Sequence, residues 1–180
     1  MSFFNSKQPG FSEEGWHAAR CFSLVQLGTI FIVNKFQSQV RLTWEMPFDK
    51  RQYNGQTPAP KQISREYASS FYGKSWLKQH LASWLGDDIV LQLDKKFDPY
   101  LILGQPCQIK IEHKMNPNSG TWFEEITNIL PLADKEMPPQ FNETRLLTFD
   151  NFDRELFNKL PDFVAQKIMS SKEYQYIKVA

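Results

Sequence analysis

A strict alternation of apolar and polar residues marks one strand of this chain. Between Val40 and Met46 every even position is apolar and every odd position is polar. This period of two places the apolar side chains on one face of a β-strand and the polar ones on the other. Pro47 is predicted to end the strand, because it has no N–H to donate to a neighbouring strand. Strands are also predicted over residues 15–27 and 61–71, with a loop or hairpin over 28–38 and a turn-rich loop over 48–60.

After the third strand the pattern changes to a helical period. From Gly73 to Gly86 apolar residues recur three and four positions apart, which predicts a helix with Trp76 and Trp84 in its buried stripe. Gly86 is expected to end this helix. The segment 87–104 fits either a short helix or an irregular crossing. Two strands joined by a hairpin loop and then two short helices are predicted beyond it, over residues 106–114, 121–132, 152–160 and 162–170.

The predicted elements follow the order strand, strand, strand, helix, strand, strand. This is the order of the OB-fold, a partly open barrel whose second and third strands bind oligonucleotides or oligosaccharides. We therefore expect a mainly β protein. A five-stranded OB-type barrel, with a helix between its third and fourth strands, is predicted over residues 1–132, and a C-terminal helical appendage over residues 133–180.

Composition narrows the choice of partners. Hydrophobic residues make up 41% of the 180 residues, enough for a packed core, and the formal net charge is only +1. That charge argues against a protein that coats duplex DNA by charge alone. It is unevenly distributed, since residues 35–86 hold eight basic and three acidic residues whereas residues 134–162 hold four basic and seven acidic ones. A basic middle is thus followed by an acidic segment.

Cysteine usage and hydropathy indicate the compartment. Cys21 and Cys107 belong to no Cys-x-x-Cys pair, so we expect small buried thiols and no disulfide framework. Residues 1–10 are polar, unlike a secretory signal, and apolar runs such as 29–33 are too short to span a bilayer. We expect a cytoplasmic protein with no membrane partner. The three histidines show no metal-ligand spacing, so neither a metal nor another cofactor is expected.

Several short runs carry a resemblance to a known family. They are VRLTWEMP (40–47), ISREY (63–67), KSWLK (74–78), WLG (84–86), LGQPC (103–107), residues 126–132, LPDF (160–163) and KI (167–168). With these runs the chain resembles phage and prophage proteins of replication or recombination modules, which are OB-type single-stranded-DNA-binding proteins. The resemblance implies non-enzymatic binding of single-stranded DNA during phage replication or recombination, in the cytoplasm of a bacterial host cell. It implies replication or recombination proteins as further partners, leaves homo-oligomerisation open and carries over no catalytic residue.

A groove that binds single strands needs cations along the phosphates and flat side chains against the bases. On the predicted fold such residues occur on strands two and three and in the loops that flank them. The candidates are Lys35, Phe36, Arg41, Lys61, Arg65, Tyr67, Lys114 and Trp122. Each has a structural alternative, since the aromatic rings, Trp44 above all, can fill the core and the arginines can lie on a solvated exterior.

Two other functions are compatible with the sequence. Glu112-x-Lys114, with Asp94 and Asp98 upstream, has the residue types of metal-dependent nucleases, which hold Mg²⁺ and position a water. An OB-type protein-interaction module without a nucleic-acid role would fit the near-zero net charge. The chain has no glycine-rich phosphate loop, Gly-x-Ser-x-Gly elbow or His-Glu-x-x-His helix, which argues against an ATPase, a serine hydrolase or a metalloprotease.

Overall fold

The computed structural model describes residues 10–52 and 54–177, and a long β-hairpin forms its centre. Strands β1 (Gly15–Ile32) and β2 (Lys35–Arg51) pair antiparallel along most of their length. Val33 and Asn34 join them with φ angles of 45° and 63°. A two-residue connection with positive φ at both positions matches the right-handed twist of paired strands. The hairpin alternative for residues 28–38 is therefore confirmed, with both strands extending into the segment.

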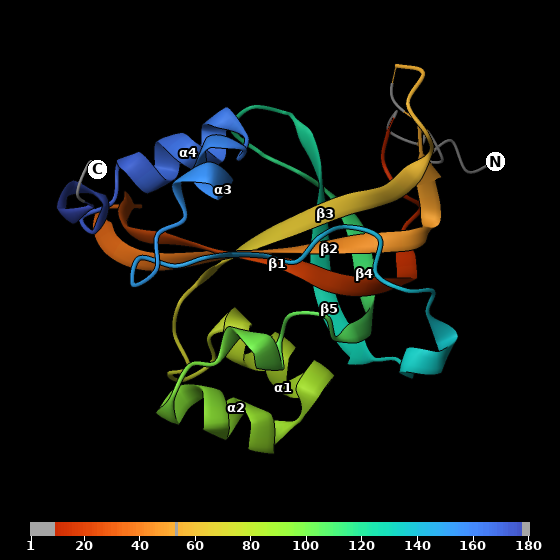
Figure 1. Ribbon diagram of the computed structural model, residues 1–180, viewed down its shortest axis with the longest axis horizontal. Helices are drawn as coiled ribbons and strands as arrows, with labels where there is room; N and C mark the ends of the chain where they lie inside the picture. Colours follow the sequence, from red (N-terminus) through yellow and green to blue (C-terminus); the bar gives the residue numbers. More distant parts are fainter. Residues whose placement is uncertain (1–9, 53, 178–180) are drawn as a thin grey trace.

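Three further long strands complete one open sheet (Figure 1). They are β3 (Ala59–Ala68), β4 (Pro106–Met115) and β5 (Trp122–Pro131), and the order across the sheet is β3-β2-β1-β4-β5, antiparallel throughout. A short strand, β6 (Arg145–Leu147), pairs in parallel with residues 23–25 of β1, beyond the part of β1 that pairs with β4. The mainly β prediction is confirmed. In the described part of the chain β3 and β5 face each other without a ladder, so the sheet is open there.

The prediction that Pro47 ends the second strand is wrong. Strand β2 continues to Arg51, and its pairing with β3 shifts register between Met46 and Lys50. Pro47 lies in this irregular stretch, which has no ladder position that needs its missing N–H. Bulges are where a strand tolerates proline, and they also bend the strand. The shift therefore explains how β2 passes Pro47 and curves over the end of the sheet.

The main core lies between the sheet and the two helices α1 (Trp76–Leu85) and α2 (Asp87–Lys95). The apolar residues at even positions from Val40 to Met46 are all buried there, as predicted. Trp44 and Trp84 lie with ring centroids 6.1 Å apart, and Gly86 follows the last residue of α1. Trp76, however, is 57% exposed, so its assignment to the core is wrong. The buried positions of α1 are 77, 80, 81 and 84, and Trp76 falls outside this stripe.

The C-terminal segment packs on the other face of the central strands. Figure 1 shows α3 (Arg154–Asn158) and α4 (Asp162–Met169) across the sheet from α1 and α2. A second buried cluster joins this segment to β1, and its members are Val25, Leu27, Leu147, Phe157, Val164 and Ile168. Within the described residues, 3₁₀ turns form at Pro99–Leu101, Asp134–Glu136 and Tyr174–Tyr176. Residues 133–177 thus contribute a strand and a core layer, and the predicted domain boundary after residue 132 stays a prediction.

Buried polar groups tie this layer to the sheet. Glu45 is 2% exposed, and its carboxylate accepts hydrogen bonds from the backbone N–H of Phe141 and Asn142, both at 2.8 Å, and from Nδ2 of Asn142 at 2.7 Å.

Cys21 and Cys107 are buried free thiols, as predicted, and burial raises the pKa of Cys21 to about 12. No helix in residues 10–52 and 54–177 combines the length and the apolar composition needed to cross a membrane.

Candidate nucleic-acid interface

Lys61, one of the predicted binding residues, lies in a buried polar network. Its Nζ donates to both carboxylate oxygens of Glu124, at 2.7 and 2.8 Å, to Ser12 Oγ at 2.9 Å and to the Gly10 carbonyl at 3.1 Å. The side chain of Lys61 is 9% exposed and that of Glu124 is 12% exposed. A phosphate could reach this ammonium group only by breaking the network. Lys61 is therefore removed from the candidate interface and given a structural role.

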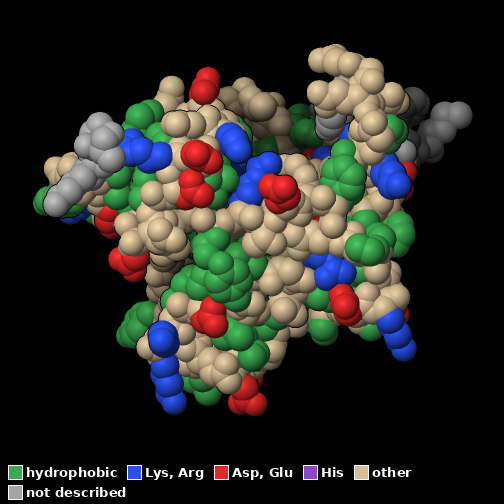
Figure 2. All heavy atoms as spheres, viewed as in Figure 1, with side chains coloured by type: hydrophobic (Ala, Val, Ile, Leu, Met, Phe, Trp, Pro, Cys, Tyr) green, Lys and Arg blue, Asp and Glu red, His purple; other side chains and the backbone are tan. Residues whose placement is uncertain are grey.

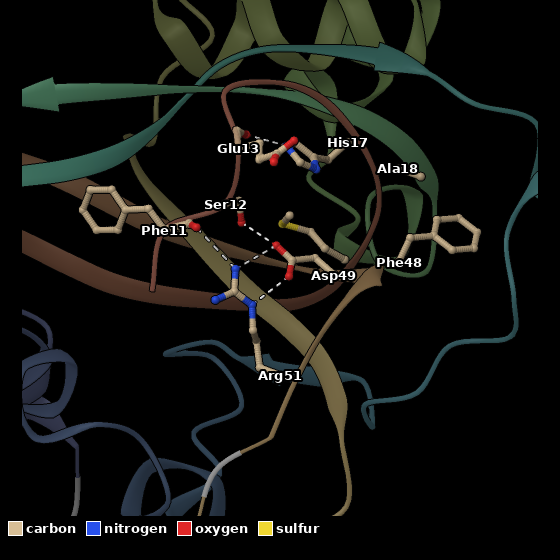
Figure 3. A pocket seen from close by; sticks show the side chains of 9 residues that line it. Phe11, Ser12, Glu13, His17, Ala18, Phe48, Asp49 and Arg51 are labelled. Carbon is tan, nitrogen blue, oxygen red and sulfur yellow. Dashed lines mark hydrogen bonds and ion pairs between the residues drawn. The ribbon is translucent and has the colours of Figure 1, made fainter. Parts of the chain in front are cut away.

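The same network holds the first described residues over one end of the sheet. Figure 3 shows Ser12 and Arg51 directed toward Asp49, at the side of a hollow of about 360 Å³. Ser12 Oγ donates to Asp49 Oδ2 at 2.7 Å, and Arg51 Nε donates to Asp49 Oδ1, also at 2.7 Å. The hydrogen bond from Arg51 is the largest influence on Asp49 and keeps its pKa below the ordinary value despite partial burial. These polar groups satisfy one another's hydrogen-bonding capacity. We therefore interpret the hollow as a place where the first described residues are fastened to the sheet, and not as a ligand site.

Tyr67 is also buried, contrary to its predicted place on an exposed binding face. Its ring is 2% exposed, and its hydroxyl lies 2.7 Å from Nδ1 of His80. Burial raises the pKa of Tyr67 and lowers that of His80 to about 4. His80 is therefore neutral near pH 7, accepting from Tyr67 through Nδ1 and donating to the Thr127 carbonyl through Nε2 at 3.3 Å. No base can stack on a ring enclosed in this way.

Arg65 lies at the opening between β3 and β5. Its guanidinium lies over the rings of Tyr67 and Trp76, at 5.2 and 5.5 Å from the two centroids. Nη1 donates to the backbone carbonyl of Ile126 on β5 and lies 3.5 Å from Glu125 Oε1. Side chains such as Arg65 thus bridge the two strand edges that no backbone ladder joins. The side chain is only 16% exposed, so Arg65 presents part of its charge to solvent.

A groove of about 420 Å³ lies at this opening and is lined by residues of β2, β3, β5 and α4. Its lining comprises Arg41, Ser64, Arg65, Glu66, Phe123, Glu124, Glu125, Ile126, Phe163 and Lys167. Phe123 and Phe163 contribute rings that are 44% and 51% exposed. Phe163 and Lys167 are four residues apart, which places them on the same face of α4. The C-terminal segment therefore forms one side of the groove.

The cations of the groove already have carboxylate partners. Arg41 Nη1 lies 2.9 Å from Glu66 Oε1, and Lys167 Nζ lies 2.6 Å from Glu66 Oε2. The guanidinium of Arg41 also lies over the ring of Phe163, 5.1 Å from its centroid. Figure 2 shows basic and acidic side chains intermingled where α4 meets the sheet, so neither sign dominates this face. Of the cations predicted along strands two and three, Arg41 and Arg65 line this groove and Lys61 does not, and both arginines are paired with carboxylates.

The remaining predicted residues lie in the two hairpins. Phe36 is 56% exposed at the β1–β2 hairpin beside Lys35, and the ammonium of Lys172 lies 3.8 Å from its ring centroid. In the β4–β5 hairpin Lys114 lies opposite Phe123 in register, so the two share a face. Trp122 is 44% exposed, but as the neighbour of Phe123 along β5 it points to the other face. Lys114 thus shares the face of Phe123 without being among the residues that line the groove, and Trp122 points to the opposite face.

Eight of the ten groove residues were not among the candidates from the sequence, and four of these eight carry the charged and aromatic groups considered below: Glu66, Phe123, Phe163 and Lys167. Glu66 lies on a predicted strand but is neither a cation nor a flat ring, and no pattern distinguishes Phe123 from its neighbour Trp122. The spacing of Phe163 and Lys167 on a short amphipathic helix was a usable signal of a shared face. What no pattern could supply was the side of the sheet on which that helix lies.

The residues of the nuclease alternative are not assembled into a metal site. Asp94 lies in α2, Asp98 accepts from the backbone N–H of Tyr100, and Glu112 lies in β4. Within residues 10–52 and 54–177 no three side chains of His, Cys, Asp or Glu come together in a way that could hold a metal ion.

The fold and groove define a mainly β protein with a composite surface built by its open sheet and its C-terminal helix. Comparison with protein-family models, with curated proteins and with solved structures gave no match. The resemblance to phage single-stranded-DNA-binding proteins therefore stays a prediction.

Proposed function

We propose that this protein binds single-stranded DNA in the groove between β3, β5 and α4 and does not act on it chemically. The observation that carries the proposal is the pairing of two exposed rings, Phe123 and Phe163, with the cations Arg41, Arg65 and Lys167 in one groove. Flat rings for bases and cations for phosphates are the two requirements of a single-strand groove. The resemblance in sequence supports placing this activity in phage replication or recombination, in the bacterial cytoplasm.

The strand order supports an OB-type interpretation of the sheet. The order β3-β2-β1-β4-β5 is that of a five-stranded Greek-key barrel left open between its third and fifth strands. In OB-folds the face formed by the second and third strands binds oligonucleotides, together with the loops after strands one and four. The groove lies beside that face. In this protein α4 takes part of the space, so a bound strand would pass between α4 and the β4–β5 hairpin.

Stacking, rather than charge, should dominate the affinity. Base–aromatic stacking contributes about 1–3 kcal/mol per base. Phosphate contacts make binding depend on salt. For single strands the logarithm of the binding constant falls with the logarithm of the salt concentration with a slope of about −0.7 per phosphate. Glu66 and Glu125 already pair with the cations of the groove. Few of these cations are therefore free to neutralise phosphates and so release the counterions that surround the strand. We expect a slope of only about −1 to −2, corresponding to two or three phosphates.

Fluorescence anisotropy with a labelled oligothymidylate tests the proposal. A length of about 20 nucleotides exceeds the roughly 4–16 that one OB-fold covers, and a duplex of equal length is the comparison. Titrations at about 50 and about 200 mM salt, in EDTA, give the slope. Phe123→Ala and Phe163→Ala should each weaken binding about 5- to 150-fold, the equivalent of one lost stack. Phe48→Ala, which truncates a ring that is 72% exposed outside the groove, is the matched control.

The outcomes separate the proposal from its alternatives. Preference for the single strand, loss on both groove substitutions and intact DNA after incubation would support it. Equal affinity for duplex, or groove variants that bind like Phe48→Ala, would refute it. Cleavage that appears with Mg²⁺ and disappears on Glu112→Ala would replace it with the nuclease alternative.

A further inference from the structure

Glu66 occupies an unusual position in the groove. It lies opposite Arg41 in the β2–β3 ladder, so both side chains leave the sheet on the same face. One carboxylate oxygen accepts from Arg41 Nη1 at 2.9 Å and the other accepts from Lys167 Nζ at 2.6 Å. The two cations come from β2 and from α4, which are far apart in sequence. A single anion thus joins two cations at the place where the sheet meets the helix.

This arrangement has the form of an anion site. Two cations that face one anion through separate oxygens are what a phosphodiester group, with its two non-bridging oxygens, would need. The side chains of Arg41, Glu66 and Lys167 are 20%, 21% and 40% exposed, so solvent and a ligand can reach them. These pairs are partly screened by solvent, so breaking them costs less than breaking the buried pair of Lys61 and Glu124. The carboxylate can therefore leave without disturbing a buried core.

We propose that Arg41 and Lys167 form a phosphodiester site and that Glu66 occupies it in the free protein. The inference rests on the proposed function, because the phosphodiester is that of the strand bound in the groove. On binding, a phosphate takes the place of the Glu66 carboxylate between the two cations, and Glu66 turns to solvent. Phe163 keeps Arg41 in position, since the guanidinium lies over one side of its ring.

The exchange gives the groove a preference for strands over small anions. A free phosphate gains only what Glu66 already supplies to Arg41 and Lys167, so it has little advantage at this site. A strand that also stacks on the exposed rings gains additional binding free energy and can displace the carboxylate. Glu66 thereby acts as a specificity-determining residue of the groove. A purely structural ion pair, by contrast, would fasten α4 to β3 and be needed equally in free and bound protein.

Glu66→Gln separates these two roles. The amide keeps the size of the side chain but removes the charge that competes with phosphate. Affinity for the oligothymidylate should rise about three- to tenfold, the range expected when two exposed ion pairs no longer compete. The salt dependence should steepen by at most about 0.7, because the unaltered protein takes up a cation at the displaced Glu66 carboxylate and so offsets the counterions released from one phosphate. Glu143→Gln makes the same charge change at an exposed position outside the groove and should leave both quantities unchanged.

Two further measurements make the result decisive. In the double variant Glu66→Gln, Lys167→Gln the gain should disappear, because the second cation of the site is gone. Thermal melting of each variant shows that the fold persists. Unchanged or weaker binding by folded Glu66→Gln, or a gain equal to that of Glu143→Gln, would overturn the inference while leaving the proposed function standing. Failure of the unaltered protein to bind any single strand would instead refute the proposed function.

Discussion

A methyl group added at Gly28 would show how firmly the C-terminal segment is held on the sheet. Gly28 has a φ of 84° at a shift in the β1–β2 register, a conformation that L residues rarely adopt. A Cβ at this position would lie 2.6 Å from Ser171 Cβ and 2.7 Å from Glu173 Oε2. Both atoms belong to the segment after α4. Relief of the overlap therefore requires that this segment move away from β1.

Two contributions set the size of the effect. Left-handed backbone in a residue with a Cβ costs about 1–2 kcal/mol. Moving Glu173 breaks the hydrogen bonds that it accepts from Thr29 N at 2.6 Å and Thr29 Oγ1 at 2.5 Å. Hydrogen bonds to charged groups contribute about 1.5–3 kcal/mol each, and the lower end applies to a partly exposed carboxylate. We expect Gly28→Ala to lower the free energy of unfolding by about 4–5 kcal/mol.

Gly55→Ala is the matched control. Gly55 has a φ of 75°, and a Cβ at that position would meet nothing within 4 Å. It should lose only the backbone contribution of about 1–2 kcal/mol. Urea denaturation gives both free energies, and hydrogen exchange of the amides around residue 173 reports release of the segment. Equal losses in the two variants, with exchange unchanged near Glu173, would refute the reasoning.

Three other substitutions probe buried polar groups. The free energy of unfolding should fall as the pH drops from 6.5 toward about 4, because burial lowers the folded-state pKa of His80 and the unfolded chain binds the proton first. Urea melts across this window should show that His80→Gln loses this dependence of the unfolding free energy on pH and that His17→Gln keeps it. Lys61→Ala should cost about 3–5 kcal/mol in urea melts, since it leaves Glu124 charged and unpaired in a buried site. Glu45→Gln should cost about 2 kcal/mol in the same measurement, because an amide oxygen cannot accept the three N–H groups that the carboxylate accepts.

The alternation of residues 40–46 predicted a strand correctly because one face of β2 meets an apolar core. The same pattern does not report what covers the polar face. Glu45 on that face is 2% exposed, covered by the segment around residues 141–142. A second layer donated by a distant part of the chain satisfies polar groups without changing the local period of two. Local pattern therefore reports that a strand exists but not how many layers cover it.

The candidate site shows the same limit at single residues. Strand alternation placed Arg65 and Tyr67 on one face, as the structure has them. That face meets the core, so Tyr67 is enclosed beside His80 while the longer Arg65 reaches the opening at β5. The length of the side chain, rather than its position in the alternating pattern, decides which of the two residues reaches the surface. Lys61 was misplaced because its partner Glu124 lies 63 residues away.

The contribution of the C-terminal segment decides which experiments can test the interface. Deleting residues 133–180 would remove β6, expose Val25 and Leu27 of β1 and leave Glu45 without its backbone donors. Loss of binding in such a truncation would follow from damage to the sheet, whatever the groove does. Phe163→Ala and Lys167→Gln change the same helix at its exposed face and leave the buried cluster intact. These substitutions alone separate a helix that binds the strand from one that supports the sheet beneath it.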